Sequence, residues 1–190
     1  SVRTIPRWVS TATTMVAAVA TFVVAMGLWN DIREDGPRST LADAFAVDGF
    51  SIFFTVLIAV ALVATALLAD AYIEREGIAA PEFHALLMSA SAGAIVMASA
   101  NDLIVLFLGL ESLSIALYVL IAMHVRRAEA REAAMKYFVL GAFSSAFLLY
   151  GIALVYGATG STNLVHIRQY LLDNVLRDEQ LLLAGMALLL

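Results

Sequence analysis

Residues 101–120 read NDLIVLFLGLESLSIALYVL, an apolar run of helix length with a single carboxylate, Glu111, near its middle. An α-helix rises about 1.5 Å per residue, which places Glu111 about 12 Å from the start of the run at Leu103. The hydrocarbon core of a bilayer is about 30 Å thick, so this carboxylate is expected close to its centre. An acid in that position is unfavourable and indicates a function.

The composition indicates a membrane protein. Hydrophobic residues make up 62% of the 190 residues, charged residues make up only 14%, and the mean hydropathy is +0.90. Soluble proteins contain fewer hydrophobic and more charged residues. The apolar runs do not alternate with polar residues, which argues against transmembrane β-strands and favours helices that cross a bilayer. We therefore predict an all-α membrane protein, a polytopic transmembrane helix bundle.

The apolar runs divide the chain into five full spans and the start of a sixth. A span needs about 20 residues, and the last run has about half that length. Because the chain also begins with Ser1 instead of an initiator methionine, we expect a fragment of a longer protein that forms a single membrane domain over residues 1–190. The predicted spans cover residues 8–29, 50–69, 83–100, 103–123, 133–156 and, incompletely, 181–190.

The connections between the spans carry turn and cap signals. Residues 30–47 are expected to form a solvated loop. Asp102 is suited to cap the helix that follows it, so that spans 83–100 and 103–123 form an antiparallel hairpin. Residues 163–177 have apolar side chains at helical spacing, which predicts a short amphipathic helix at the membrane surface. A helix packed on a soluble partner domain is the alternative.

Arginines in the connections predict the orientation of the chain. Basic residues are enriched in short cytoplasmic loops. The N-terminal end and the short loop after span 103–123 hold the larger share, so we expect both in the cytoplasm. One side would hold Arg3, Arg7, Arg75, Arg126, Arg127 and Arg131, and the other side Arg33, Arg38, Arg168 and Arg177.

Glu111 is the strongest functional candidate. Of the 16 acidic residues, it alone lies inside an apolar run. A charged side chain at the centre of a transmembrane helix costs about 2.5 to 3.5 kcal/mol on insertion scales, so such residues usually mark ion paths or proton relays. A glutamate that faces a movable lysine can exchange protons near neutral pH, because burial and a nearby cation shift the carboxyl pKa in opposite directions. The alternative is a protonated glutamate that only hydrogen-bonds a neighbouring helix.

Lys136 is the only lysine of the chain, which has 11 basic residues in all. Lysine, unlike arginine, can lose its proton when it is desolvated, which suits a proton relay. Lys136 also lies in the first turn of its predicted span and can extend to the cytoplasmic surface as a topological anchor. Both interpretations stay open.

Other classes of site find little support in the sequence. There is no cysteine, which excludes disulfides and thiolate metal sites. His84, His124 and His166 have no second ligand at helical spacing and are expected near the membrane interfaces, so no metal site is predicted. The sequence contains no dinucleotide, P-loop or haem motif, and its net charge of -5 suggests no nucleic-acid partner.

Several stretches together carry a family resemblance. They are NDLIVLFLGLESLSIALYVL (101–120), EAAMKYFVLGAFSSAFLLYGIALVYGATGSTNL (132–164), LLLAGMALLL (181–190), AVDGF (46–50) and PEFHALLMSASAGAIVMASAN (81–101). These stretches resemble subunit N of the proton-pumping NADH:quinone oxidoreductase, respiratory complex I. The resemblance covers residues 47–190 well and the first span more loosely.

The resemblance implies an antiporter-like bundle with inverted helix repeats, of which this chain would supply the second to sixth helices and the start of the seventh. Glu111 would be the fifth-helix glutamate, paired with a seventh-helix lysine in a proton half-channel. That lysine is expected shortly after Leu190. Lys136 would belong to the polar path that leads in from the cytoplasm.

The resemblance also implies partners and a location. The chain would contact the lipid bilayer and other membrane subunits of complex I in the bacterial plasma (inner) membrane, with protons as its only small substrate. It would bind no cofactor and perform no redox chemistry, since FMN, iron–sulfur clusters and quinone would be bound by other subunits. The alternatives are an Mrp-type cation/proton antiporter subunit, a membrane-bound hydrogenase subunit, or, in another class, a non-conducting scaffold subunit.

Overall fold

The computed structural model describes residues 6–124, 127–174 and 180–189. Arg3, Arg126, Arg177, Leu190 and the last residues of the predicted surface helix lie outside the described residues. The helices are α1 (Arg7–Asp35), α2 (Gly49–Glu76), α3 (Ala80–Ala98), α4 (Leu103–Ala122), α5 (Ala128–Thr159), α6 (Leu164–Asp173) and α7 (Gln180–Leu189), and the strands are β1 (Arg38–Thr40) and β2 (Phe45–Val47).

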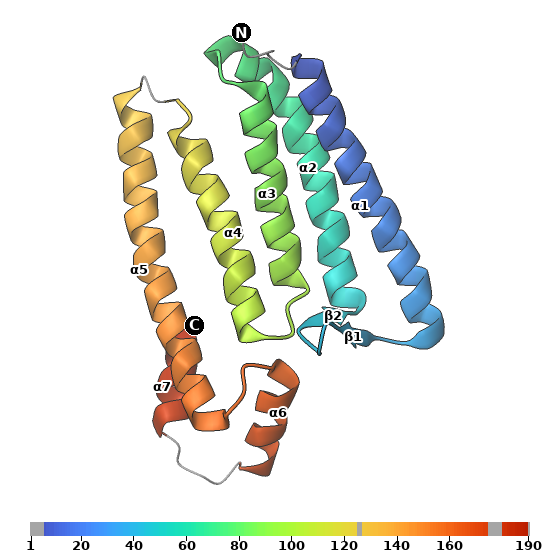
Figure 1. The fold of residues 1–190 in the computed structure, drawn as a ribbon, viewed down its shortest axis with the longest axis vertical. Helices are drawn as coiled ribbons and strands as arrows, with labels where there is room; N and C mark the ends of the chain where they lie inside the picture. The colour runs from blue at the N-terminus through green and yellow to red at the C-terminus, as the bar shows by residue number, and fades with distance from the viewer. Residues whose placement is uncertain (1–5, 125–126, 175–179, 190) are drawn as a thin grey trace.

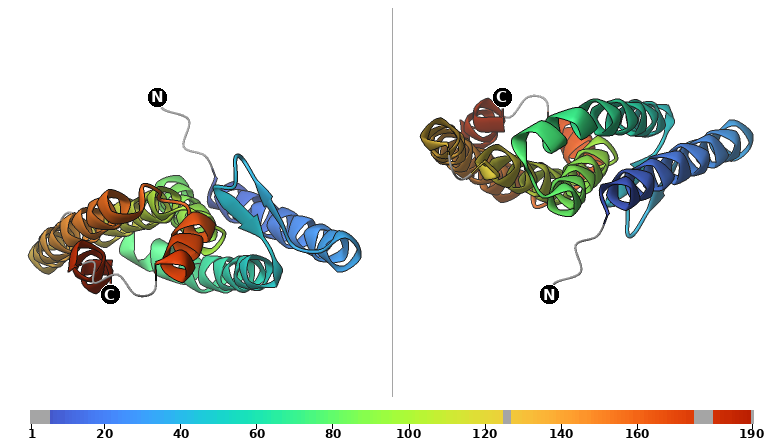
Figure 2. Two further views of the ribbon diagram at one scale, coloured as in Figure 1. Left: turned by 90° about the horizontal axis from the view of Figure 1, so that it is seen from below. Right: turned by 90° about the horizontal axis from the view of Figure 1, so that it is seen from above.

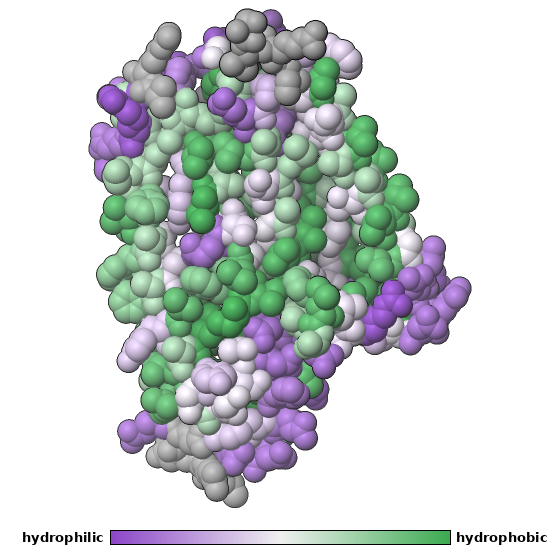
Figure 3. All heavy atoms as spheres, viewed as in Figure 1, coloured by the Kyte–Doolittle hydropathy of each residue, from purple (hydrophilic) through white to green (hydrophobic). Residues whose placement is uncertain are grey.

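Helices α1 to α5 lie side by side and alternate in direction (Figure 1). All five are long and apolar enough to cross a membrane. Hydrophobic side chains cover the middle of the face shown in Figure 3, and hydrophilic side chains gather at its two ends. The chain is therefore an all-α membrane bundle, as the sequence predicts. Helix α1 runs to Asp35 and α5 begins at Ala128, beyond the predicted spans, because helical hydrogen bonding continues past the apolar segment.

Side-chain caps fix where several helices begin. The Asp48 carboxylate accepts a hydrogen bond from the Ser51 N–H at 2.8 Å, and the Asp48 N–H donates to the Ser51 hydroxyl at 3.0 Å. Asp102 accepts from the Ile104 N–H at 2.8 Å, which confirms its predicted role as a cap. Each cap satisfies a backbone N–H that has no partner within its own helix.

The connection between α1 and α2 differs from the predicted loop. Strands β1 and β2 pair antiparallel, with Arg38 opposite Val47. Leu41, Ala42 and Asp43 make the turn with φ of 52°, 56° and 63°. Left-handed backbone is unfavourable for residues other than glycine, so the turn needs support from outside the hairpin.

That support comes from distant parts of the chain and ties one end of the bundle together. The side-chain amides of Asn101 and Asn163 both donate to the Asp43 carbonyl oxygen, at 2.8 and 2.9 Å. The Leu164 N–H in turn donates to the Asn101 carbonyl oxygen at 2.9 Å. The hairpin turn, the α3–α4 turn and the start of α6 thus form one clamp, which we call the Asp43 clamp. Local sequence patterns could not predict this hairpin, since its partners lie 58 and 120 residues away.

Helices α6 and α7 follow α5 at the C-terminal end of the chain (Figure 2). Helix α7 runs antiparallel to α5 and packs closely against it. A Cβ added to Gly185 would lie 2.9 Å from the Val155 nitrogen. A Cβ added to Gly151 would lie 3.0 Å from the Gly185 oxygen and 3.0 Å from the Leu188 side chain. These glycines let the two backbones approach closely. A buried cluster joins α4, α5, α6 and α7 and consists of Leu103, Ile152, Val155, Ile167 and Leu182.

Candidate functional site

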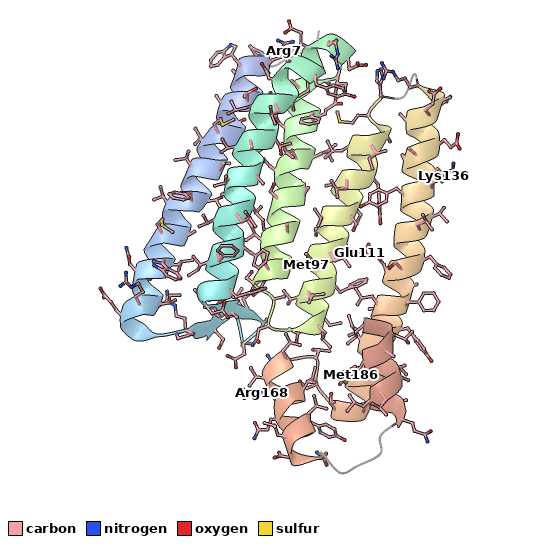
Figure 4. The ribbon with its side chains drawn as sticks, turned by 180° about the vertical axis from the view of Figure 1, so that it is seen from behind. Arg7, Met97, Glu111, Lys136, Arg168 and Met186 are labelled. Atoms are coloured by element: carbon pink, nitrogen blue, oxygen red, sulfur yellow. The ribbon has the colours of Figure 1, made fainter. Side chains whose placement is uncertain are left out.

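Glu111 lies half-buried on α4 and faces α5 (Figure 4). The Ser145 hydroxyl of α5 donates a hydrogen bond to Glu111 Oε1. The carboxylate therefore points into a helix–helix contact with a polar partner, not toward lipid. Sequence reasoning did not identify Ser145 as the partner of Glu111.

The backbone near Glu111 is held on its other side by α3. A Cβ added to Gly109 would lie 2.6 Å from the Met97 nitrogen, and one added to Gly93 would lie 2.6 Å from the Leu113 nitrogen. Residues advance by about 100° along a helix, so Glu111 projects to the side opposite Gly109. The contact with α3 thus directs Glu111 toward α5.

Lys136 lies away from Glu111. Its ammonium group pairs with Glu132 at 2.5 Å, one turn earlier on α5, and its side chain is 71% exposed. Lys136 and Ser145 are nine residues apart, which is about two and a half turns and about 14 Å, so they occupy opposite faces of α5. Figure 4 shows Lys136 on the outer side of the helix. The structure therefore does not bring the two predicted site residues together.

Tyr118 extends the α4–α5 contact toward the N-terminal end of α5. It lies seven residues after Glu111, about two turns, and so shares its face of α4. A Cβ on Gly141 would lie 1.9 Å from the Tyr118 hydroxyl oxygen, so the phenol occupies the space above that glycine. The ring also meets Tyr137 edge to face at 5.0 Å. Sequence reasoning missed Tyr118, although its spacing from Glu111 was a usable signal.

Charged side chains join the helices at the end of the bundle opposite the Asp43 clamp. Glu76, the last residue of α2, places Oε2 2.6 Å from Arg127 Nη2 and 2.9 Å from His124 Nε2. The Glu76 side chain is only 13% exposed. Next to it lies a cavity of about 590 Å³, lined by Glu76, Glu82, Met123 and His124 among others. This end therefore offers a polar opening beside α2, α3 and α4.

No metal site is apparent in the part of the chain that the structure describes. Within residues 6–124, 127–174 and 180–189, no three His, Asp or Glu side chains gather so that they could hold a metal ion. The polar groups near Glu111 are hydroxyls, which can donate and accept hydrogen bonds.

Comparison with known proteins identifies the family. The family described as "NADH:quinone oxidoreductase/Mrp antiporter, TM" matches residues 100–190, which include Glu111 and Lys136. NADH-quinone oxidoreductase subunit N of Trichlorobacter lovleyi is 40% identical over 152 residues, covering 80% of this chain. Subunit N 2 of Roseiflexus castenholzii is 40% identical over 176 residues, covering 92% of this chain. Residues 100–190 of the chain belong to this NADH:quinone oxidoreductase/Mrp antiporter family.

Two solved structures share the family fold. A chain of respiratory complex I from Thermus thermophilus matches with a TM-score of 0.77 and 31% identity, over 97% of this chain and 38% of that one. A chain of an archaeal membrane-bound sulfane sulfur reductase matches with a TM-score of 0.81 and 26% identity, over 94% and 37% of the two chains. The same bundle therefore occurs in complexes of different chemistry.

The chain spans about a third of the length of these relatives, since it covers 31% of the Trichlorobacter subunit and 34% of the Roseiflexus subunit. It is a multi-pass membrane segment of the family. The family match begins at residue 100, so it covers α4 to α7 and leaves α1 to α3 outside.

Proposed function

We propose that this chain forms part of a subunit N that translocates protons in a bacterial NADH:quinone oxidoreductase of the plasma membrane. The observation that carries the proposal is Glu111, a carboxylate in the middle of a spanning helix whose partner is a hydroxyl of the adjacent helix. The identity of about 40% to subunit N relatives supports this choice over an antiporter or hydrogenase subunit. NADH oxidation and quinone reduction, with FMN and iron–sulfur clusters, would take place in other subunits.

Ser145 suits a glutamate that changes its protonation state. A hydroxyl has one hydrogen to donate and lone pairs to accept. It can donate to the Glu111 carboxylate when the acid is ionised, and it can accept from the carboxyl O–H when the acid is protonated. The contact between Ser145 and Glu111 can therefore persist in both protonation states, at a depth where an unpartnered polar atom would cost several kcal/mol.

The ionised state of Glu111 also requires a cation, and we propose that it comes from the helix that α7 begins. Helix α7 runs antiparallel to α5, and Leu188 lies beside Gly151. Ser145 lies six residues before Gly151, which is about 9 Å along the axis. A continuation of α7 by about six residues past Leu188 reaches the level of Glu111. A lysine there would complete the pair.

Lys136 has a different role in this proposal. Exposed and paired with Glu132, it would collect protons at the cytoplasmic side instead of bonding Glu111 directly. The described helices would belong to a single membrane domain that contacts the bilayer and neighbouring membrane subunits.

In a non-conducting scaffold subunit, a permanently protonated Glu111 would also hydrogen-bond Ser145. The two functions are therefore distinguished by measuring proton translocation. The test is Glu111→Gln, which keeps the shape of the side chain and removes its acidity. We expect NADH-driven proton uptake into inverted membrane vesicles to fall strongly, while NADH oxidation by an artificial acceptor and complex assembly persist. Unchanged proton uptake per NADH oxidised would support the scaffold instead.

A further inference from the structure

A second polar site lies between α1, α2 and α3 and is centred on His84. The sequence predicts a ring near the membrane interface, and the structure adds that His84 is only 1% exposed and lies between helices. Its Nδ1 is 3.0 Å from the Thr14 hydroxyl oxygen, and its Nε2 is 3.4 Å from the Thr11 hydroxyl oxygen. Both ring nitrogens therefore have partners on α1.

Thr14 fixes which ring nitrogen carries the hydrogen in the neutral ring. The Thr14 hydroxyl donates its only hydrogen to the Ser10 carbonyl oxygen at 3.0 Å. With its hydrogen in that bond, Thr14 accepts from His84, which favours Nδ1 as the protonated nitrogen of the neutral ring. The neutral ring then presents Nε2 to Thr11 as a bare acceptor.

The Thr11 hydroxyl has one hydrogen and three acceptors within reach, which are the Arg7 carbonyl oxygen at 3.3 Å, four residues earlier on α1, and two side chains. Its oxygen is 3.4 Å from His84 Nε2 and 3.4 Å from Asp70 Oδ1 on α2. When His84 is neutral, Thr11 donates to Nε2. When His84 is protonated, Nε2–H donates to the Thr11 oxygen and the Thr11 hydrogen turns to the Asp70 carboxylate. The hydroxyl thus connects the acid and the imidazole in either state.

Of the three side chains Asp70, Thr11 and His84, Asp70 lies at an open pocket. Thr11 and Asp70 line a pocket of about 550 Å³ together with Arg7, Trp8, Ala12 and Met15. Arg7 lies at the end of the bundle away from the Asp43 clamp (Figure 4), where it pairs with Glu74 at 3.1 Å. The path therefore runs from an open, charged end inward to a buried imidazole.

The charges around His84 come from the three helices that form the site. Arg7 lies on α1, Asp70 and Glu74 lie on α2, and Glu82 lies on α3 itself. Helix α4 contacts α3 at Gly93, nine residues after His84 and so on the opposite face of α3. Glu111 therefore belongs to a different side of that helix.

We propose that His84 Nε2 is a proton-binding site that is filled from the pocket through Asp70 and Thr11. Asp70 takes up a proton at its carboxylate. The carboxyl O–H then passes its hydrogen to the Thr11 oxygen while Thr11 passes its own hydrogen to His84 Nε2. The products are an Asp70 carboxylate, an intact hydroxyl and an imidazolium, and no other reactant is needed. The proposal does not depend on the role of Glu111.

The test is the protonation of His84 in the full-length protein in lipid bilayers. Histidine is labelled with ¹⁵N, and the His84 signals are identified by their loss in His84→Gln. We expect the neutral ring to carry its hydrogen on Nδ1 and Nε2 to gain a proton as the pH is lowered from about 9 to 5. Hydrogen on Nε2 in the neutral ring, or a ring that does not titrate in this range, would overturn the proposal.

Threonine variants test the path itself. In Thr11→Val, proton exchange at Nε2 should slow about tenfold or more, whereas Thr11→Ser keeps the hydroxyl and should retain exchange. The matched control is Thr21→Val, because Thr21 makes the same kind of bond to the carbonyl four residues earlier but does not contact His84. Equal exchange rates in Thr11→Val and Thr21→Val would contradict the path. The position of the ring hydrogen in the unsubstituted protein tests the proposal even if a variant does not fold. None of these measurements uses NADH, so they are independent of the proposed role of Glu111.

Discussion

Gly93 of α3 and Gly109 of α4 face each other with no side chain between their backbones. A Cβ on Gly93 would lie 2.8 Å from the Gly109 carbonyl oxygen, and a Cβ on Gly109 would lie 2.9 Å from the Gly93 oxygen. Because Glu111 follows Gly109 by two residues, the spacing of α3 and α4 sets the position of the carboxylate. A methyl group at either glycine meets backbone, which cannot move aside as a side chain can.

Gly93→Ala should therefore destabilise the bundle by about 1 to 3 kcal/mol, the usual cost of overpacking a tight contact. The thermal unfolding midpoint of the purified full-length protein measures this loss. Gly27→Ala is the control, since a Cβ on Gly27 meets nothing within 4 Å. Equal midpoints for the two variants would show that the α3–α4 contact can relax.

Gly141→Ala tests the contact with Tyr118. The new methyl group would overlap the Tyr118 hydroxyl and displace the phenol from its edge-to-face contact with Tyr137. We expect a loss of about 1 to 2 kcal/mol, part of which Tyr118→Phe should restore in the double variant. Gly157→Ala on the same helix is the control, because its Cβ would lie 3.5 Å from Leu181, an ordinary contact. Additive losses in the double variant would argue against a direct clash.

Ser145→Ala removes the hydrogen bond to Glu111. A hydrogen bond to a charged group contributes about 1.5 to 3 kcal/mol, so the rate of NADH-driven proton uptake should fall about tenfold or more if the ionised glutamate takes part in the limiting step. Ser144→Ala is the matched control, since Ser144 is the exposed neighbour on α5. A loss of uptake that is as large in Ser144→Ala would point to a general effect on α5.

Lys136→Ala should leave stability unchanged within about 0.5 kcal/mol, because an exposed ion pair one turn apart contributes little. If Lys136 collects protons, the same variant should lower proton uptake while Glu132→Ala does not. The measurement is the initial rate of NADH-driven uptake in vesicles with equal complex content. Equal rates in both variants and the unsubstituted protein would leave Lys136 only the role of a topological anchor.

Glu76→Gln should loosen the start of α5. Glu76 accepts from Arg127 and contacts His124, so it ties α2 to the α4–α5 connection. Amide hydrogen exchange near Arg127 should become faster in this variant. Glu74→Gln is the control, because its pair with Arg7 is exposed and does not involve that connection. Equal exchange in both variants would show that Glu76 does not hold the connection.

Sequence reasoning predicted those features that depend on local pattern. The apolar runs predicted the five spanning helices, Asp102 was expected to cap α4, and Glu111 stood out because its setting in the chain is apolar. Such signals are read within one or two helical turns.

The features that were missed depend on contacts between distant residues. The sequence near Asp43 does not predict that two distant asparagines stabilise its left-handed turn. The burial of His84 against α1 was not predicted, because hydropathy does not show which face of α3 meets α1. Likewise, the separation of Lys136 from Glu111 follows from the rotation of α5, which the spacing of Lys136 and Ser145 encodes only once Ser145 is known to face α4.

The two ends of the bundle are joined by different kinds of contact. At the Asp43 clamp, uncharged amides meet backbone oxygens, whereas the opposite end relies on Glu76 with Arg127 and on Arg7 with Glu74. Dissolved ions screen the second set of contacts and leave the first nearly unchanged. High ionic strength should therefore weaken the contacts between helices more at the Glu76 end of the bundle than at the Asp43 clamp.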